Sequence, residues 1–313
     1  MRPTLLLALI FAVLASTTGT SLAQHPQPQR PAITGIAFMR VYSTDPAAAE
    51  RFYGTTLGLT RVVADSSDAK WVYAVNSRQW VEVLPHTPPP SATQRMVAVA
   101  FMTRDAAALE RYLNAKGVAT TEPMHDGEFG VRDPEGNLVL FVDGHEREGV
   151  AKLVAAAPTS ETAASQRIIH VGFIVRDRAK EDTFWREVLG FTPYWHGGRT
   201  ESETDWVSQQ VPEGQDWLEY MLSASATPTL KETGTQDHFS LGTERIQTVL
   251  ARLQANGCTD AQCRAIQVGH DGKIQLNLFD PDQTRAEFME FTPAIKSCCS
   301  PMLGHPPGPI EAK

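Results

Sequence analysis

Four polar residues interrupt apolar runs that are typical of buried β-strands. They are two histidines and two glutamates: His170 in IIHVGFIV, Glu219 in WLEYML, His238 at the start of HFSLG, and Glu287 in RAEFMEF. A carboxylate inside a buried strand needs a partner that balances its charge. Two imidazoles and two carboxylates together make a suitable set of donors for a divalent metal ion. The 49 residues from His170 to Glu219 equal the 49 from His238 to Glu287, so we predict that two similar units each contribute a pair.

Strands and helices with a recurring order must position these side chains. A β-like run at 168–175 precedes a helix at 178–189, which Gly190 terminates, and strands follow near 206–211 and 217–222. The order then restarts, with a strand at 239–242, a helix at 244–256 that ends at Gly257, and strands at 274–279 and 285–291. Such repeated units predict an α+β fold whose curved sheets enclose a cavity.

The whole arrangement occurs twice along the chain. FYGTTLGL matches FWREVLGF, and HDGEFGVRDPEGNLVLF matches HDGKIQLNLFDPDQTRAEF. Trp71, Trp80 and Glu82 correspond to Trp206, Trp217 and Glu219. We therefore expect two domains of one fold in tandem, at 33–145 and 167–293.

The second copy resembles the vicinal oxygen chelate (VOC) superfamily, which includes glyoxalase I, bleomycin-resistance proteins and extradiol dioxygenases. The similar segments are IIHVGFIVRD, FWREVLGF, WLEYML, DHFSLGT and DPDQTRAEFMEF, although Gln283 stands where the family's turn usually has glycine. The resemblance implies a tandem pair of VOC domains, each built from two βαβββ modules with curved mixed or antiparallel sheets that enclose a cavity. It also implies a metal at four strand positions, occupied here by His170, Glu219, His238 and Glu287. Glu290, three residues on, should face the other way.

The first domain should not bind that metal. We match its positions to Gly35, Glu82, approximately Ala98, and Leu140, so that three of the four ligands are missing. The first domain then supports the second by packing or by closing its cavity.

Three functions are consistent with this resemblance. The leading one is a metal-dependent, glyoxalase-like lyase or isomerase acting on a small oxygen-chelating substrate, with Zn, Ni, Mn or Fe(II) as the divalent ion. The second is an extradiol-type ring-cleaving dioxygenase with an Fe(II) site of two histidines and one carboxylate. The third is a non-catalytic binding or resistance protein. Glu219 discriminates between the first two functions. As a ligand or base it favours the lyase or isomerase, whereas facing away it leaves the donor set of the dioxygenase. The glutamate at the matching position of the metal-less domain, Glu82, weakens this argument.

Other side chains are expected around the cavity. Glu219 and Glu287 are the main catalytic candidates, and His270 in VGHDG is a weaker one because His125 repeats it in the metal-less domain. Alternation places Gln275, Asn277 and Phe279 on one strand face. Further aromatic and polar residues that we expect to shape the pocket are Trp195, His196, Trp206 and Tyr220.

The N-terminus indicates export, with an uncleaved N-terminal anchor as the alternative, and the overall charge bears on the class of partner. Residues 1–23 have a positive start, an apolar core and a small-residue cleavage site, which together predict a signal peptide; 24–32 is a Pro-rich linker. We therefore expect a periplasmic or extracellular protein with no membrane association after cleavage. The formal net charge of −8 and the absence of a basic block argue against a nucleic-acid partner. A small-molecule substrate is expected, and a homodimer is compatible with the sequence.

The remaining segments are a second linker at 146–166, with some helical tendency, and a Cys/Pro/Gly-rich tail at 294–313. Cys258 and Cys263 predict a local disulfide, which export permits. For Cys298 and Cys299 three alternatives stay open: a vicinal disulfide, a soft-metal site with His305, or a link to another segment.

Overall fold

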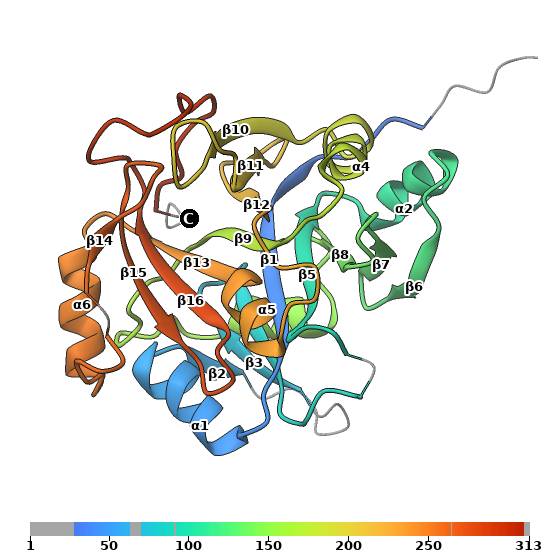
Figure 1. Ribbon diagram of the computed structural model, residues 1–313. Helices are drawn as coiled ribbons and strands as arrows, with labels where there is room; N and C mark the ends of the chain where they lie inside the picture. The colour runs from blue at the N-terminus through green and yellow to red at the C-terminus, as the bar shows by residue number, and fades with distance from the viewer. Residues whose placement is uncertain (1–27, 63–69, 91, 264, 310–313) are drawn as a thin grey trace, which may run out of the picture.

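The computed structural model describes residues 28–62, 70–90, 92–263 and 265–309 (Figure 1). The predicted signal peptide at 1–23 and residues 24–27 of the first linker lie outside these residues. Within the described part of the chain, no helix combines the length and apolar character needed to cross a membrane.

The chain folds into two eight-stranded mixed sheets, one per domain. The first sheet runs, in spatial order, β2 (Thr60–Val62), β3 (Trp71–Ala74), β4 (Trp80–Leu84), β1 (Ile33–Tyr42), β5 (Met96–Thr103), β8 (Leu138–Asp143), β7 (Glu128–Arg132) and β6 (Thr120–His125). The second repeats that order with β10 (Thr192–Gly197), β11 (Trp206–Gln210), β12 (Trp217–Met221), β9 (Ile168–Ile174), β13 (His238–Thr243), β16 (Arg285–Glu290), β15 (Ile274–Phe279) and β14 (Gln267–Val268). In each sheet the two modules join through one antiparallel central pair, β1 with β5 and β9 with β13. The predicted α+β tandem of VOC domains with βαβββ modules is confirmed.

The helices sit at corresponding places in the modules. They are α1 (Pro46–Glu50), which continues as a π-helical turn over Arg51–Thr56; α2 (Ala106–Ala115); α3 (Gly149–Ala156); α4 (Arg178–Asp182), which continues as a π-helical turn over Thr183–Val188; α5 (Leu230–Gln236); and α6 (Ile246–Ala255). Gly190 and Gly257 follow the helices of the second domain with φ of 79° and 90°. These left-handed conformations explain why glycine terminates the helices at the predicted positions.

The two domains exchange hydrogen bonds in a reciprocal pattern. The residue before β4, Gln79, accepts a hydrogen bond from Ile168 N at 2.8 Å. The corresponding residue before β12, Asp216, accepts one from Ile36 N, also at 2.8 Å. Gln79 and Asp216 are buried. In each domain, a side chain therefore accepts a hydrogen bond from the first strand of the other domain. A single large core cluster contains side chains from both domains.

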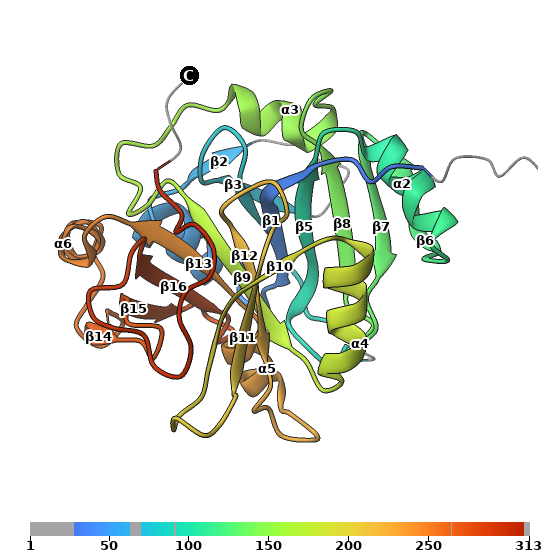
Figure 2. The same ribbon diagram turned by 90° about the horizontal axis from the view of Figure 1, so that it is seen from above.

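The concave faces of the sheets, which we call the first and second cups, are filled differently. The first cup holds a purely apolar cluster that includes Phe38, Ala98 and Leu140, and α3 contributes Ala151 and Val154 to it. Figure 2 shows α3 lying across β5 and β8. The second cup has a smaller aromatic cluster that includes Tyr194, Trp195 and Trp217. Beside this cluster, the second cup holds the buried polar side chains of His170, His238 and Glu287.

The C-terminal segment, residues 292–309, connects the two edges of the second sheet. At the β14–β15 side, Cys298 N donates to His270 O at 2.8 Å, and at the β10 side Leu303 N donates to Tyr194 O at 2.8 Å. This segment runs beside β10 in Figure 1. Cys298 and Cys299 are joined in a vicinal disulfide, and the predicted Cys258–Cys263 disulfide is also present.

Candidate metal centre in the second domain

His170, Glu219, His238 and Glu287 converge inside the second cup from four adjacent strands, β9, β12, β13 and β16. His170 Nε2 lies 2.9 Å from His238 Nε2 and 3.1 Å from Glu287 Oε2. Glu219 Oε2 is 3.6 Å from His238 Nε2. One donor atom from each of His170, Glu219 and His238 lies within 4.8 Å of the other two. The predicted four-residue cluster is thus a real spatial cluster.

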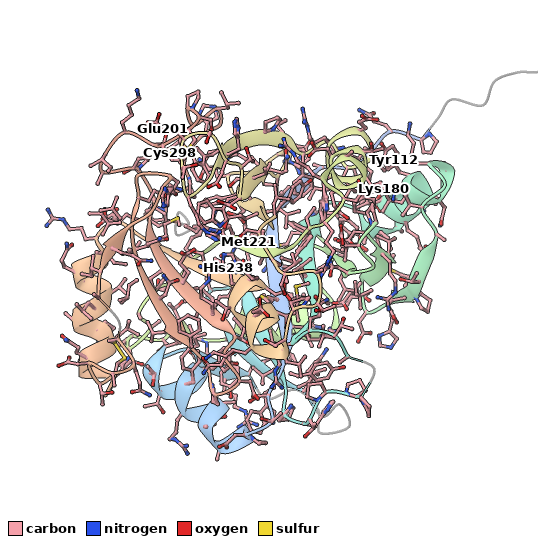
Figure 3. The ribbon with its side chains drawn as sticks, in the orientation of Figure 1. Tyr112, Lys180, Glu201, Met221, His238 and Cys298 are labelled. Carbon is pink, nitrogen blue, oxygen red and sulfur yellow. A yellow bond between two sulfur atoms is a disulfide. The ribbon has the colours of Figure 1, made fainter. Side chains whose placement is uncertain are left out.

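The backbone around His238 fixes its ring. Helix α5 ends directly before β13, and the carbonyl of its last residue, Gln236, lies 2.7 Å from His238 Nδ1. A proton on Nδ1 satisfies that carbonyl and leaves the Nε2 lone pair directed at the other three side chains. The opposite strand carries Gly172, and a Cβ there would come within 2.3 Å of the His238 ring. His238 therefore occupies space that only glycine leaves free. Figure 3 shows where His238 lies in the molecule.

Burial and neighbouring charges keep the donors in metal-binding forms. The pKa of His238 is well below its usual value, first because burial disfavours the cation and then because of Arg285 and His170. Burial alone would raise the pKa of Glu287, but Arg285 and His170 outweigh it and bring the pKa down to about 2. A neutral imidazole and an ionised carboxylate are the forms that bind metals.

Glu219 is the carboxylate with the least support from the protein. Burial raises its pKa, partly offset by His170. Its nearest side-chain hydrogen bond is from Ser208 Oγ at 3.4 Å. Glu219 therefore has a weakly held oxygen that is available to a metal ion or to a proton.

A buried lysine that the sequence analysis missed lies behind the cluster. The Lys273 side chain is fully buried, and its Nζ lies 4.1 Å from the centre of the Trp217 ring, which in turn stacks on His170 at 4.7 Å. Within the described structure, Nζ has no hydrogen-bond acceptor. Burial lowers the pKa of Lys273 to about 8, against the opposing pull of Asp271, Glu219 and Glu287. Strand alternation could have located Lys273, because it stands two residues before Gln275 and therefore points to the same face of the sheet.

A cavity of about 330 Å³ opens from the cluster to solvent. Glu219 and Glu287 form part of its wall, together with Arg285, another residue that the sequence analysis missed. The predicted pocket residues Trp195, Trp206 and Gln275 also line it. His270 lies at this wall too, exposed and with its ring 5.3 Å from that of Trp206, so it sits near the mouth rather than at the centre.

Four predicted pocket residues do not line this cavity: Asn277, Phe279, Tyr220 and His196. Tyr220 faces the other side of β12 and belongs to the core shared by the domains. His196 is exposed, and its backbone binds the Ser300 side chain. Glu290 behaves as predicted, since its carboxylate accepts a hydrogen bond from Ile246 N at 3.0 Å on the outer face of the sheet.

The first domain lacks the cluster, but one of the predicted correspondences is wrong. Trp217 pairs with His170 across two strands, and the matching Trp80 pairs with Phe38, not with Gly35. Phe38 stacks on Trp80 at 4.8 Å, much as His170 stacks on Trp217. The other three correspondences hold. Glu82 pairs with Arg40 as Glu219 pairs with Gly172, and Ala98 opposes Arg40 as His238 opposes Gly172. Leu140 opposes Ala100 as Glu287 opposes Ser240.

Side-chain cations balance the one carboxylate that the first cup retains. Glu82 is fully buried, and its oxygens lie 2.5 Å from Arg40 Nε and 3.5 Å from Lys70 Nζ. Arg40 stands where the second domain has Gly172, so its side chain fills the space that a metal-binding histidine would use. Burial would raise the pKa of Glu82, but Arg40 and Lys70 lower it below its usual value. The negative charge of Glu82 in the first cup is therefore balanced by cations of the same domain.

A family model agrees with this architecture. The model for the Glyoxalase/Bleomycin resistance protein/Dioxygenase superfamily matches residues 35–141 and 167–288. The chain belongs to this superfamily. No curated protein sequence matches the chain. The superfamily assignment covers both cups, including the one without the metal-type donors.

Solved structures with the same fold are extradiol dioxygenases. A Brevibacterium fuscum homoprotocatechuate 2,3-dioxygenase in complex with 3,4-dihydroxyphenylacetate has a TM-score of 0.60 and 21% identity, covering 84% of this chain and 82% of that one. A room-temperature structure of an extradiol ring-cleaving dioxygenase from B. fuscum has a TM-score of 0.62 at 21% identity, covering 84% and 73%. At this identity the likeness concerns the fold, including the tandem arrangement of the domains.

Proposed function

We propose that this chain is a metal-dependent enzyme that transfers a proton on a small substrate with two chelating oxygens, as a lyase or isomerase. The observation that carries the proposal is the position of Glu219. Its carboxylate turns into the cavity beside His238, so that the second cup offers two imidazoles and two carboxylates rather than three donors. A fourth, weakly held carboxylate suits a group that also accepts a proton.

The residues present fit a divalent ion. The Nε2 atoms of His170 and His238 lie 2.9 Å apart. Two lone pairs at this distance would repel one another unless the nitrogens share a proton or both bind one cation. His170, Glu219, His238 and Glu287 would hold the ion, which when bound would polarise a substrate carbonyl or enediolate. Zn, Ni, Mn and Fe(II) are all compatible with a mixed nitrogen and oxygen donor set.

The chain's own groups would handle the substrate's charge and proton. Glu219 would take the proton from substrate carbon, with Ser208 holding its other oxygen. Lys273 and Arg285 lie near the carboxylates, where their positive charges would stabilise an anionic intermediate. Trp195 and Trp206 line the cavity and limit the access of water to the proton.

A second candidate is ring cleavage by dioxygen, which the likeness to extradiol dioxygenase structures favours. In that case His170, His238 and Glu287 form the two-histidine, one-carboxylate set, and Glu219 is not a ligand. A non-catalytic binding protein is the third candidate, but sequestration alone does not need two buried imidazoles aimed at each other. Export, and a periplasmic or extracellular location, remain part of the proposal, as do a small-molecule substrate and the compatibility with a homodimer.

The first experiment is elemental analysis of the purified protein and of His170→Ala. We expect about one divalent metal per chain in the wild type, and loss of most of it in the variant, because removing one of four donors weakens binding by orders of magnitude. A wild type without metal, or a variant that keeps it, would remove the basis for an enzyme of this type.

The reaction type is separated by two assays on the metal-loaded protein. Exchange of substrate carbon-bound hydrogen for deuterium, followed by NMR with α-hydroxycarbonyl compounds, reports proton transfer. Oxygen uptake with catechols reports ring cleavage. We expect exchange that Glu219→Gln abolishes while metal content falls less than in His170→Ala. Oxygen uptake that survives Glu219→Gln would instead establish the dioxygenase alternative.

A further inference from the structure

A second, larger cleft lies away from the metal centre, between the domains. It has a volume of about 640 Å³ and is walled by the β3–β4 turn, the segment 163–167 and the start of α6. Four arginines line it, Arg78, Arg147, Arg167 and Arg245, and among the described residues the acidic side chain in its wall is Glu244. In a chain with a net charge of −8, such a local excess of positive charge is unusual.

Three of these arginines have no carboxylate partner. Among the ion pairs of the described residues, only Arg167 is matched, with Asp216. Arg147 donates instead to two backbone carbonyls, Ser77 O at 3.0 Å and Gly144 O at 3.4 Å. Burial and the nearby charge of Arg78 both work against the Arg147 cation and lower its pKa. The fold thus holds the positive charges of Arg78 and Arg147 near one another in a partly buried position, where they repel each other.

The start of α6 supplies an independent argument, because the first domain provides a control. Asp105 occupies the N-cap of α2, and its carboxylate accepts a hydrogen bond from Ala108 N at 2.7 Å. The corresponding N-cap of α6 is Arg245, which makes no side-chain capping bond. Both helices are ten residues long and both are followed by a glycine with positive φ, so the elements match closely.

An arginine at this position is unfavourable for the helix itself. The N-terminus of a helix carries a partial positive charge, which repels a cation and attracts an anion. Although Glu290 accepts a hydrogen bond from Ile246 N, the N-cap of α6 has an arginine that disfavours the helix where α2 has a stabilising aspartate, and this arginine is the fourth that lines the cleft. An anion held between the helix terminus and the arginines would reverse both effects.

We propose that this cleft binds a small oxyanion ligand, of the size of a metabolite, that carries a phosphate group or two carboxylates. The planar guanidinium groups of Arg147 and Arg78 match such oxygens in a bidentate manner, and Arg245 approaches from the helix side. The volume of the cleft is in the range of ordinary ligand sites. Its concave shape and single small patch of charge favour a small molecule over a polymer.

The test measures binding of inorganic phosphate, pyrophosphate and citrate by calorimetry and by thermal unfolding, each against sodium chloride of equal ionic strength. We expect saturable binding of at least one of the three, with a matching rise in Tm. Phosphate or pyrophosphate binding without citrate binding identifies a phosphate ligand, and the reverse identifies a polycarboxylate.

Two variants and two controls locate the site. Arg147→Gln and Arg245→Asp should each weaken binding about tenfold or more, since each removes a charged hydrogen-bond donor. Without ligand, Arg245→Asp should have a higher Tm than the wild type, because it restores the cap found in the first domain. Arg252→Asp, which makes the same charge change on the same helix outside the cleft, should leave the affinity near that of the wild type. His170→Ala should also keep it, which separates this site from the metal centre.

The proposal is wrong if none of the three anions binds saturably beyond the chloride control. It is also wrong if Arg147→Gln and Arg245→Asp bind as tightly as the wild type, or if His170→Ala abolishes binding.

Discussion

Each cup contains a buried carboxylate on the same strand position, and the two are neutralised differently. Glu82 in the first cup is held by Arg40 and Lys70. Glu219 in the second cup faces two imidazoles and a further carboxylate instead. A buried carboxylate always needs compensation. The first domain obtains it from its own side chains, whereas we propose that the second obtains it from a metal ion.

The contribution of the Arg40–Glu82 ion pair to stability can be measured with Arg40→Met. We expect a loss of about 2–3 kcal/mol in the free energy of unfolding, because Glu82 then keeps Lys70 as its nearby cation and a hydrogen bond from Trp80 Nε1 at 3.0 Å, but loses its closer ion pair. The double variant Arg40→Met/Glu82→Gln should lose less than the sum of the single changes, by about 1 kcal/mol or more. Urea unfolding of the four proteins checks this. Additive effects would show that the two side chains are not coupled.

At the metal centre, Lys273→Met removes a buried positive charge beside Glu219 and Glu287. The variant should bind a divalent ion several-fold more tightly, since the lysine and the ion compete for the same carboxylates. Competition titrations with Zn²⁺ and Mn²⁺ give the affinities. Weaker binding in the variant would mean that Lys273 supports the centre rather than opposing the ion.

At the scale of elements, alternation along the strands predicted much of the site. One register error gave the wrong first-domain counterpart of His170. The alternation correctly separated Glu287 from Glu290, and it also contained Lys273 and Arg285, which were overlooked. Because β1 has ten residues and β9 has seven, His170 corresponds to Gly35 when the strands are aligned at their first residues, but to Phe38 in the observed register. Strands β10 and β14 were not located, since edge strands lack the continuous apolar pattern of central ones.

The central antiparallel pair of the second sheet makes a specific prediction for Gly172→Ala. The new methyl group would lie 2.3 Å from the His238 ring, so the ring must move away from the other donors. We expect a loss of about 1–3 kcal/mol in stability together with loss of bound metal. Gly308→Ala is the control, because its Cβ would meet nothing within 4 Å. A Gly172→Ala protein with full metal content would show that His238 does not need this space.

At the scale of the molecule, the predicted two similar domains are closely interlocked. The Asp-Pro turn of each domain accepts hydrogen bonds from the segment that leads into a helix of the other domain. Asp282 accepts from Thr44 N, and Glu135 accepts from Arg176 N and Asp177 N, all at 2.7 Å. The segment 146–166 includes α3, which fills the first cup. None of these long-range contacts follows from local periodicity, because each depends on two segments more than 40 residues apart.

Buried carboxyls at this interface predict a pH dependence. Burial raises the pKa of Asp280 to about 7, although Tyr53 donates a hydrogen bond to it at 2.9 Å. Unfolded aspartate titrates near about 3.9, so between these pH values the folded chain binds more protons than the unfolded chain. Stability should therefore fall as pH rises from 5 to 8. Asp280→Asn should reduce that fall by about 1–3 kcal/mol in urea unfolding at the two pH values. An equally steep fall in the variant would contradict the assignment to Asp280.

The central claim is that the second cup holds one divalent ion between two histidines and two glutamates, and that the first cup holds none. The most direct measurement is anomalous diffraction at the metal absorption edge from crystals of the metal-loaded protein. The account predicts a single strong peak within coordination distance of His170, Glu219, His238 and Glu287. A peak beside Glu82 in the first cup, or no peak among the four residues of the second, would contradict it.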